Sequence, residues 1–238
     1  MHIPDGILPA QICAAGYAIA VPVTWFSLKK INRQPDPSAV IPKAALLTAT
    51  FFVASSIHIP VPPVSVHFVL NGLLGAVLGY YAFPAILIGL FFQAVIIGHG
   101  GLTTLGVDAV MMGVPALLAY HVFQLRHVLG RRFNPRFASG FCAFWAGVVG
   151  IAIASLIFFT LILTTIPSGF DATTERSAIY GLTLAHIPLA LLEGAFTTML
   201  VLFLQRVKPE LIDDPWHSSS SSDSPHKDSS YEKSATRS

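Results

Sequence analysis

Long apolar runs, separated by short polar segments, make up most of the chain. A helix that crosses a membrane needs about 20 mainly apolar residues. By this criterion the expected spans are at about residues 7–28, 41–57, 65–80, 84–98, 107–125, 138–163 and 179–204. A proline-rich segment at 58–63 separates the second span from the third, because proline cannot continue a helix. The pattern predicts an all-α integral membrane protein with about seven transmembrane helices.

The composition agrees with this prediction. Of the residues, 53% are apolar and only 11% are charged, whereas a soluble domain has roughly 25% charged residues. We expect residues 1–208 to form one transmembrane domain. Residues 209–238 are rich in serine and charged side chains from Asp213 onward, which predicts a disordered cytoplasmic tail. Cys13 and Cys142 lie within apolar runs, so we expect small buried side chains there and neither a disulfide nor a metal pair.

Basic residues are distributed unequally between the two sides of the predicted membrane domain. Those on one side are Lys29, Lys30, Arg33, Lys43, Arg126, Arg131, Arg132, Arg136, Arg206 and Lys208. The loops of the other side hold only Arg176. Because loops rich in Lys and Arg stay in the cytoplasm, this bias predicts a multi-pass protein of the cell membrane with its N-terminus outside and its C-terminus inside.

Residues 1–6, Met-His-Ile-Pro-Asp-Gly, form a candidate metal chelate. The terminal amine of Met1, the amide nitrogen of His2 and Nδ1 of His2 can bind one ion as three coplanar donors, which leaves the fourth equatorial position empty. Such a donor set suits Ni(II), Cu(II) and also Co(II), and it suits Mg(II) and Ca(II) poorly. The alternative is a frayed terminus, but Pro4 and the Asp5-Gly6 turn signal indicate a defined shape.

His67 is the candidate for the fourth ligand, because it lies where the third span begins, on the same outer side as the terminus. An interfacial histidine that bonds water or a carbonyl is the alternative interpretation. His58 and His99 lie on the same side and are weaker candidates. His121 and His127 lie near the cytoplasmic end of the fifth span, where we expect ordinary interfacial or loop histidines.

Two acids lie at or within the predicted spans, where carboxylates are costly and suggest function. Asp108 lies close to the outer surface and fits an interfacial acid as well. Glu193 lies deeper, on about the same helical face as His186, and the two fit a structural pair or a proton relay. The sequence has no P-loop and no H-E-x-x-H or C-x-x-C motif. Nucleic-acid binding has no support, because the basic residues flank spans. The sequence thus has no catalytic signature, and we expect no enzyme.

Four segments together resemble the CbiM/NikM family, the membrane-embedded substrate-binding (S) components of energy-coupling-factor transporters for cobalt and nickel. They are residues 1–6, 65–72, 100–106 and 186–194, and the resemblance covers about residues 1–208. It implies a seven-helix fold whose N-terminus inserts into a pocket, where Met1, His2 and His67 hold the metal in a roughly planar site. The chain departs from the family at Asp108, where many members have Asn, and at His99 before the glycine pair.

The resemblance also implies partners: a cytoplasmic ATPase, a transmembrane T component and a small accessory membrane subunit. The small residues Ala10, Ala14 and Ala18 look like the face that contacts the T component. The expected function is capture of Co(II) or Ni(II), cobalt favoured, as the transported substrate and not as a permanent cofactor, to feed cobalamin biosynthesis. Binding should weaken below about pH 6.5, where histidine protonates.

Two other functions stay open at this point. The chain could be a proton-coupled secondary metal transporter that uses Glu193 and Asp108 as relay acids, or a membrane scaffold or sensor that transports nothing.

Overall fold

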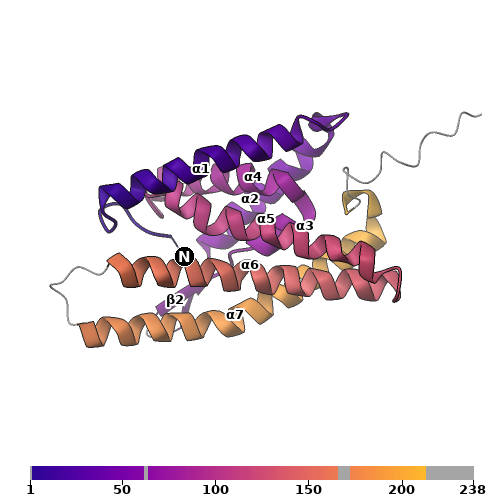
Figure 1. Cartoon of the computed structure of the whole chain (residues 1–238). Coiled ribbons are helices and arrows are strands. Elements are labelled where there is room, and N and C mark those ends of the chain that lie inside the picture. Colours follow the sequence, from indigo (N-terminus) through magenta and orange to yellow (C-terminus); the bar gives the residue numbers. More distant parts are fainter. Residues whose placement is uncertain (1, 62–63, 166–171, 213–238) are drawn as a thin grey trace, which may run out of the picture.

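A computed structural model describes residues 2–61, 64–165 and 172–212. Its main elements are the helices α1 (Ala10–Ile31), α2 (Ile41–Ser56), α3 (Asn71–Leu78), α4 (Ala82–Phe92), α5 (Leu105–Leu129), α6 (Pro135–Thr165) and α7 (Ala172–Val207). Short 3-10 turns lie at η1 (Pro37–Val40), η2 (Gly79–Tyr81) and η4 (Pro209–Leu211), and a π-helical turn, η3 (Gln93–Ile97), continues α4. The long helices run side by side in one bundle (Figure 1), so the prediction of a helical membrane protein is confirmed.

Six segments of the described chain are long and apolar enough to cross a membrane. They are Ala10–Ile31, Pro37–Ser56, Asn71–Ile97, Leu105–Leu129, Pro135–Thr165 and His186–Val207. Five of them correspond one to one with expected spans. The third and fourth expected spans fall together in the single segment Asn71–Ile97, because α3 has only eight residues and is by itself too short to cross a membrane.

Nevertheless, α3 and α4 run in opposite directions. An antiparallel hairpin of β1 (His58–Val61) and β2 (Val64–His67) pairs His58 with His67, so β2 brings the chain back to the end of α2. At the other end of α3, the Tyr81 hydroxyl lies 2.7 Å from the carbonyl of Pro37, next to the start of α2. Gln93, after α4, then bonds Ser55 at the end of α2. The described part of the chain thus passes along the bundle seven times, while seven membrane crossings stay a prediction.

Glycines let the helices around α6 approach closely. A Cβ at Gly147 would lie 2.7 Å from the Cα of Gly194 in α7, and one at Gly72 in α3 would lie 2.6 Å from the Cα of Gly147. Helices in membranes associate through such small residues because their backbones can then pack directly. Large apolar side chains such as Trp25 and Leu46 are exposed on the outside of the bundle, as expected for a surface that faces lipid.

The chain beyond α7 packs against the far end of the bundle. Nζ of Lys43 donates to the carbonyls of Val77 (3.1 Å) and Leu211 (3.0 Å), and Nη2 of Arg126 donates to the carbonyl of Ile212 (2.8 Å). Residues 209–212, which the sequence places at the start of the tail, are therefore part of the packed structure. Residues 213–238 lie outside the described residues, and their disorder stays a prediction.

Candidate metal site

The segment before α1 runs back from the start of that helix into the bundle (Figure 1). It docks on the glycine-rich loop between α4 and α5 through Asp5. The carboxylate of Asp5 accepts hydrogen bonds from the backbone N–H of Leu102 (3.1 Å) and of Thr103 (2.9 Å), and from the Thr103 hydroxyl (2.5 Å). The Thr103 hydroxyl and these N–H groups lower the pKa of Asp5, although the carboxylate is exposed. Gly101 leaves room for this carboxylate, because a Cβ there would clash with Asp5.

Ile3 is the buried part of the same segment, with 1% of its surface exposed. It packs with Leu8, Cys13 and Val107. Its N–H lies 3.3 Å from both carboxylate oxygens of Asp108 in α5, and its carbonyl accepts from the Thr104 hydroxyl at 2.6 Å. Both backbone polar groups of Ile3 are thus bonded inside the protein, which fixes the neighbouring His2 relative to α5.

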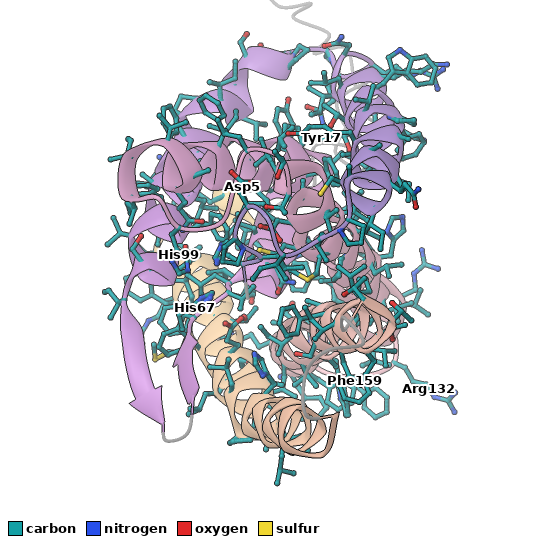
Figure 2. All side chains as sticks on the ribbon, turned by 90° about the vertical axis from the view of Figure 1, so that its left-hand side faces the viewer. Asp5, Tyr17, His67, His99, Arg132 and Phe159 are labelled. Atoms are coloured by element: carbon teal, nitrogen blue, oxygen red, sulfur yellow. The ribbon has the colours of Figure 1, made fainter. Side chains whose placement is uncertain are left out.

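Three imidazoles meet where this segment reaches β2 and the glycine loop. One ring nitrogen from each of His2, His67 and His99 lies within 4.8 Å of the other two. The ring centroids are 5.1 Å apart for His2 and His67, 4.7 Å for His2 and His99, and 6.1 Å for His67 and His99. Figure 2 looks at the bundle from this end and shows His67 and His99 side by side, with Asp5 above them.

The structure therefore brings together two of the three predicted ligands, His2 and His67. The third, Met1, lies outside the described residues, so the role of its amine stays a prediction.

Neither ring nitrogen of His2 has a hydrogen-bond partner among the described residues, although both are shielded from solvent. A buried polar atom normally finds a partner, so the unprotonated nitrogen of this ring is available to bind an ion. Burial, followed by nearby positive charge, lowers the pKa of His2 well below 6.5. His2 is consequently neutral at physiological pH, which is the form that binds metals.

His67 is held by its own backbone and by α7. Its Nδ1 lies 3.1 Å from the carbonyl of Phe68, and because a carbonyl only accepts, Nδ1 carries the proton and Nε2 keeps a lone pair for a ligand bond. Just beyond, Leu70 adopts a left-handed conformation with φ of 53°. The buried carboxylate of Glu193 accepts the N–H groups of Val69 and Leu70, so it holds the turn that leads from His67 into α3.

The other sequence candidates lie elsewhere or have structural contacts. The side chain of His58 is outside the described part of the chain. Nδ1 of His121 lies 2.7 Å from the carbonyl of Leu117, towards the opposite end of α5, in agreement with an ordinary histidine.

The two cysteines, Cys13 and Cys142, are buried free thiols, as predicted. The carboxylate of Glu193 bonds backbone of the turn before α3, while its pairing with His186, which helical spacing suggested, stays a prediction.

This geometry can be compared with known proteins. A model of the CbiM family, described as the cobalt uptake substrate-specific transmembrane region, matches residues 2–211. The chain belongs to the CbiM family. A metal transport protein of Haemophilus influenzae is 32% identical over 214 residues, which are 90% of this chain and 97% of that protein. The cobalt transport protein CbiM of Sorangium cellulosum is 30% identical over an alignment of 223 positions that covers 90% of this chain and 95% of the relative.

Two solved structures of transition metal transporters have the same fold. Each superposes with a TM-score of 0.69 over 87% of this chain, at 24% and 25% identity, and the match covers 99% and 93% of their own lengths. The family resemblance seen in the sequence is confirmed, and the chain is a multi-pass membrane component of cobalt uptake in the CbiM family.

The sequence gives His99 less weight than His67 and gives no indication of Gln93, whereas the structure places both residues near His2. The glycines on either side of His99, Gly98 and Gly100, both have positive φ, 69° and 85°, and these conformations turn the loop so that His99 faces His2. The pair of flanking glycines was the available signal, since glycine is the residue that adopts such angles without strain. Gln93 lies near enough to His2 to influence the pKa of its ring, although neither His2 nitrogen nor Oε1 of Gln93 has a partner at hydrogen-bond geometry in the described part of the chain. No feature of the sequence around Gln93 indicates this proximity.

Proposed function

We propose that this chain is the substrate-capture component of an ATP-driven, energy-coupling-factor type transporter for Co(II) and Ni(II), with cobalt favoured. The amine of Met1, the amide nitrogen and Nδ1 of His2, and Nε2 of His67 hold the ion. One observation carries the proposal: the His2 ring, whose nitrogens are shielded and without hydrogen bonds among the described residues, lies 5.1 Å from the ring of His67.

The surroundings of His2 support the same proposal. Soft or borderline metals with a tetragonal preference need nitrogen donors that have lost their protons, and burial keeps His2 neutral. The backbone bonds of Ile3 and the contacts of Asp5 hold the terminal segment against the bundle. A terminus that is positioned before the ion arrives loses little conformational freedom on binding, which favours tight capture.

The placement of charge and small residues supports the orientation and the partners. The site lies at the end of the bundle where α1 begins, whereas Lys29 and Lys30 lie in the last turn of α1, at the other end. We place the site outside the cell membrane and the C-terminus in the cytoplasm, where an ATPase subunit supplies energy. Ala10, Ala14 and Ala18 are exposed on α1, as a contact surface for a T component requires. A small accessory membrane subunit and delivery of cobalt to cobalamin synthesis complete the proposal.

The contacts of the two buried acids favour this function over a proton-coupled secondary transporter. The carboxylates of Asp108 and Glu193 accept backbone N–H groups, which gives each a structural role that needs no proton transfer. Accumulation of metal by the isolated chain in ATP-free vesicles, driven by a pH gradient alone, would overturn the ATP-driven assignment.

Isothermal titration of the purified chain with Co(II) and Ni(II) tests the site directly. We expect one ion per chain with the native terminus and no binding after N-acetylation, because acetylation removes the amine donor. His2→Ala and His67→Ala should also abolish binding, while His121→Ala, at the other end of α5, should bind as the wild type does. Tight binding by the acetylated chain or by either alanine variant would refute the ligand set, and absence of metal binding by the native chain would support a scaffold.

A further inference from the structure

His99 lies as close to His2 as His67 does, and the proposed ligand set does not use it. The centroids of the His2 and His99 rings are 4.7 Å apart, and the rings are inclined by 67°. The His99 ring is also nearly perpendicular to the His67 ring, at 83°. His2 and His67, by contrast, are inclined by only 28°. His99 thus approaches the other two imidazoles edge-on from the loop between α4 and α5.

The distances allow one ion to reach all three rings. A metal–imidazole bond is about 2.1 Å long, so two nitrogens on the same ion lie at most about 4.2 Å apart. The three ring nitrogens already lie within 4.8 Å of one another. Donors at right angles on one ion lie about 3.0 Å apart, so side-chain movements of up to roughly 2 Å bring them into range. The loop is placed to allow this approach, because a Cβ at Gly100 would lie 3.6 Å from Cβ of His2 and 3.3 Å from a carboxylate oxygen of Asp108.

We propose that His99 is a further ligand of the transported ion and binds it from outside the plane of the other donors. This inference rests on the proposed function. The terminal chelate fills three positions of a plane and His67 fills the fourth, so a third imidazole within reach can only bind above or below that plane. A planar set of four nitrogens suits Ni(II) and Cu(II). An additional nitrogen above or below the plane favours binding of Co(II), because Co(II) readily takes a fifth donor. It therefore reduces the preference of the four planar donors for Ni(II).

The test compares two variants of the full chain, His99→Ala and His99→Gln, with wild type and with His121→Ala as a matched histidine control. Each protein is titrated with Co(II) and with Ni(II), and the visible absorption spectrum of its Co(II) complex is recorded. The glutamine variant keeps a polar side chain of similar length in the loop and removes only the imidazole. We expect both His99 variants to lose Co(II) affinity by at least about tenfold, since loss of even an indirect partner of a ligand costs that much.

Ni(II) affinity should fall less, so the ratio of Co(II) to Ni(II) affinity falls, and the Co(II) bands should change in position and intensity as a donor is lost. A Co(II) spectrum that stays the same in both His99 variants would overturn the inference, whatever the affinities. If that happens while His2→Ala still abolishes binding, only the role of His99 fails. If wild type binds no ion, or His2→Ala binds tightly, the proposed function fails and the inference with it.

Discussion

Replacing Glu193 with glutamine removes one of the two carboxylate oxygens that hold the turn before α3. The side chain is fully buried, and its two oxygens serve two different donors, the N–H groups of Val69 and Leu70. Glutamine offers one acceptor, and its NH2 group would face the second N–H. One buried donor is then left without an acceptor, which costs about 1–3 kcal/mol. We expect the free energy of unfolding of Glu193→Gln to fall by this amount.

Two comparisons make this expectation specific. Glu210→Gln makes the same chemical change on an exposed side chain of η4 and should leave stability unchanged. In Asp108, both oxygens lie 3.3 Å from one donor, the N–H of Ile3, so the single oxygen of asparagine can replace them. Asp108→Asn should therefore destabilise less than Glu193→Gln, whereas Asp108→Leu, which leaves that N–H without an acceptor, should cost about 1–3 kcal/mol.

The same variant should also weaken metal binding, because Glu193 holds the turn that follows His67. If the whole loss of folding free energy acts on the position of His67, the affinity for Co(II) falls by about 5- to 150-fold. The assays are unfolding of the metal-free protein in mixed micelles and calorimetric titration with Co(II). A Glu193→Gln protein that unfolds and binds like wild type, but transports no metal, would refute the structural role and restore the proton relay.

Three further predictions concern the terminus, the bundle and pH. Asp5→Ala removes the contacts between the terminal segment and the glycine loop, so Co(II) should dissociate from this variant faster than from wild type when measured by stopped-flow chelation. The control Asp36→Ala removes a similar turn contact before η1 and should release the ion at the wild-type rate. Gly147→Ala places a Cβ 2.7 Å from the backbone of α7, so thermal unfolding should show a stability about 1–3 kcal/mol lower than that of wild type. Gly181 has open space around it, and Gly181→Ala should show no comparable loss. Because burial lowers the pKa of His2 below 6.5, its ring should stay neutral at pH 6.5 and protonate only at lower pH, so loss of metal binding through His2 begins below the pH expected from an ordinary histidine. Histidine NMR of the metal-free protein checks this, and a midpoint for His2 at or above 6.5 would contradict it.

The parts of this protein that depend on composition could be predicted from the sequence. Apolar runs of sufficient length gave five spans that match helical segments of the structure. The empty fourth position of the terminal chelate led to His67, which the structure places beside His2. Both inferences use local properties, the length of an apolar run and the number of donors in a chelate.

Features that depend on tertiary packing could not be predicted in the same way. The short α3 begins only at Asn71, because residues 64–67 form a strand with the segment after α2, and a run of apolar residues does not distinguish these two structures. The position of His99 depends on two glycine conformations in a loop, and that loop in turn fits against the docked terminus through Gly101 and Asp5.

The two buried acids show why a general expectation about charges in membranes needs the structure. A carboxylate within an apolar segment suggests proton or ion transport by default. Here each acid lies opposite backbone that no regular helix or strand satisfies: Asp108 opposite the extended terminus at Ile3, and Glu193 opposite the left-handed turn at Leu70. An unpaired N–H is costly in an apolar interior, and an unpaired carboxylate is costlier still, so a hydrogen bond between the two offsets part of the cost of each. Both acids therefore mark the places where irregular backbone carries a histidine of the proposed metal site into the bundle.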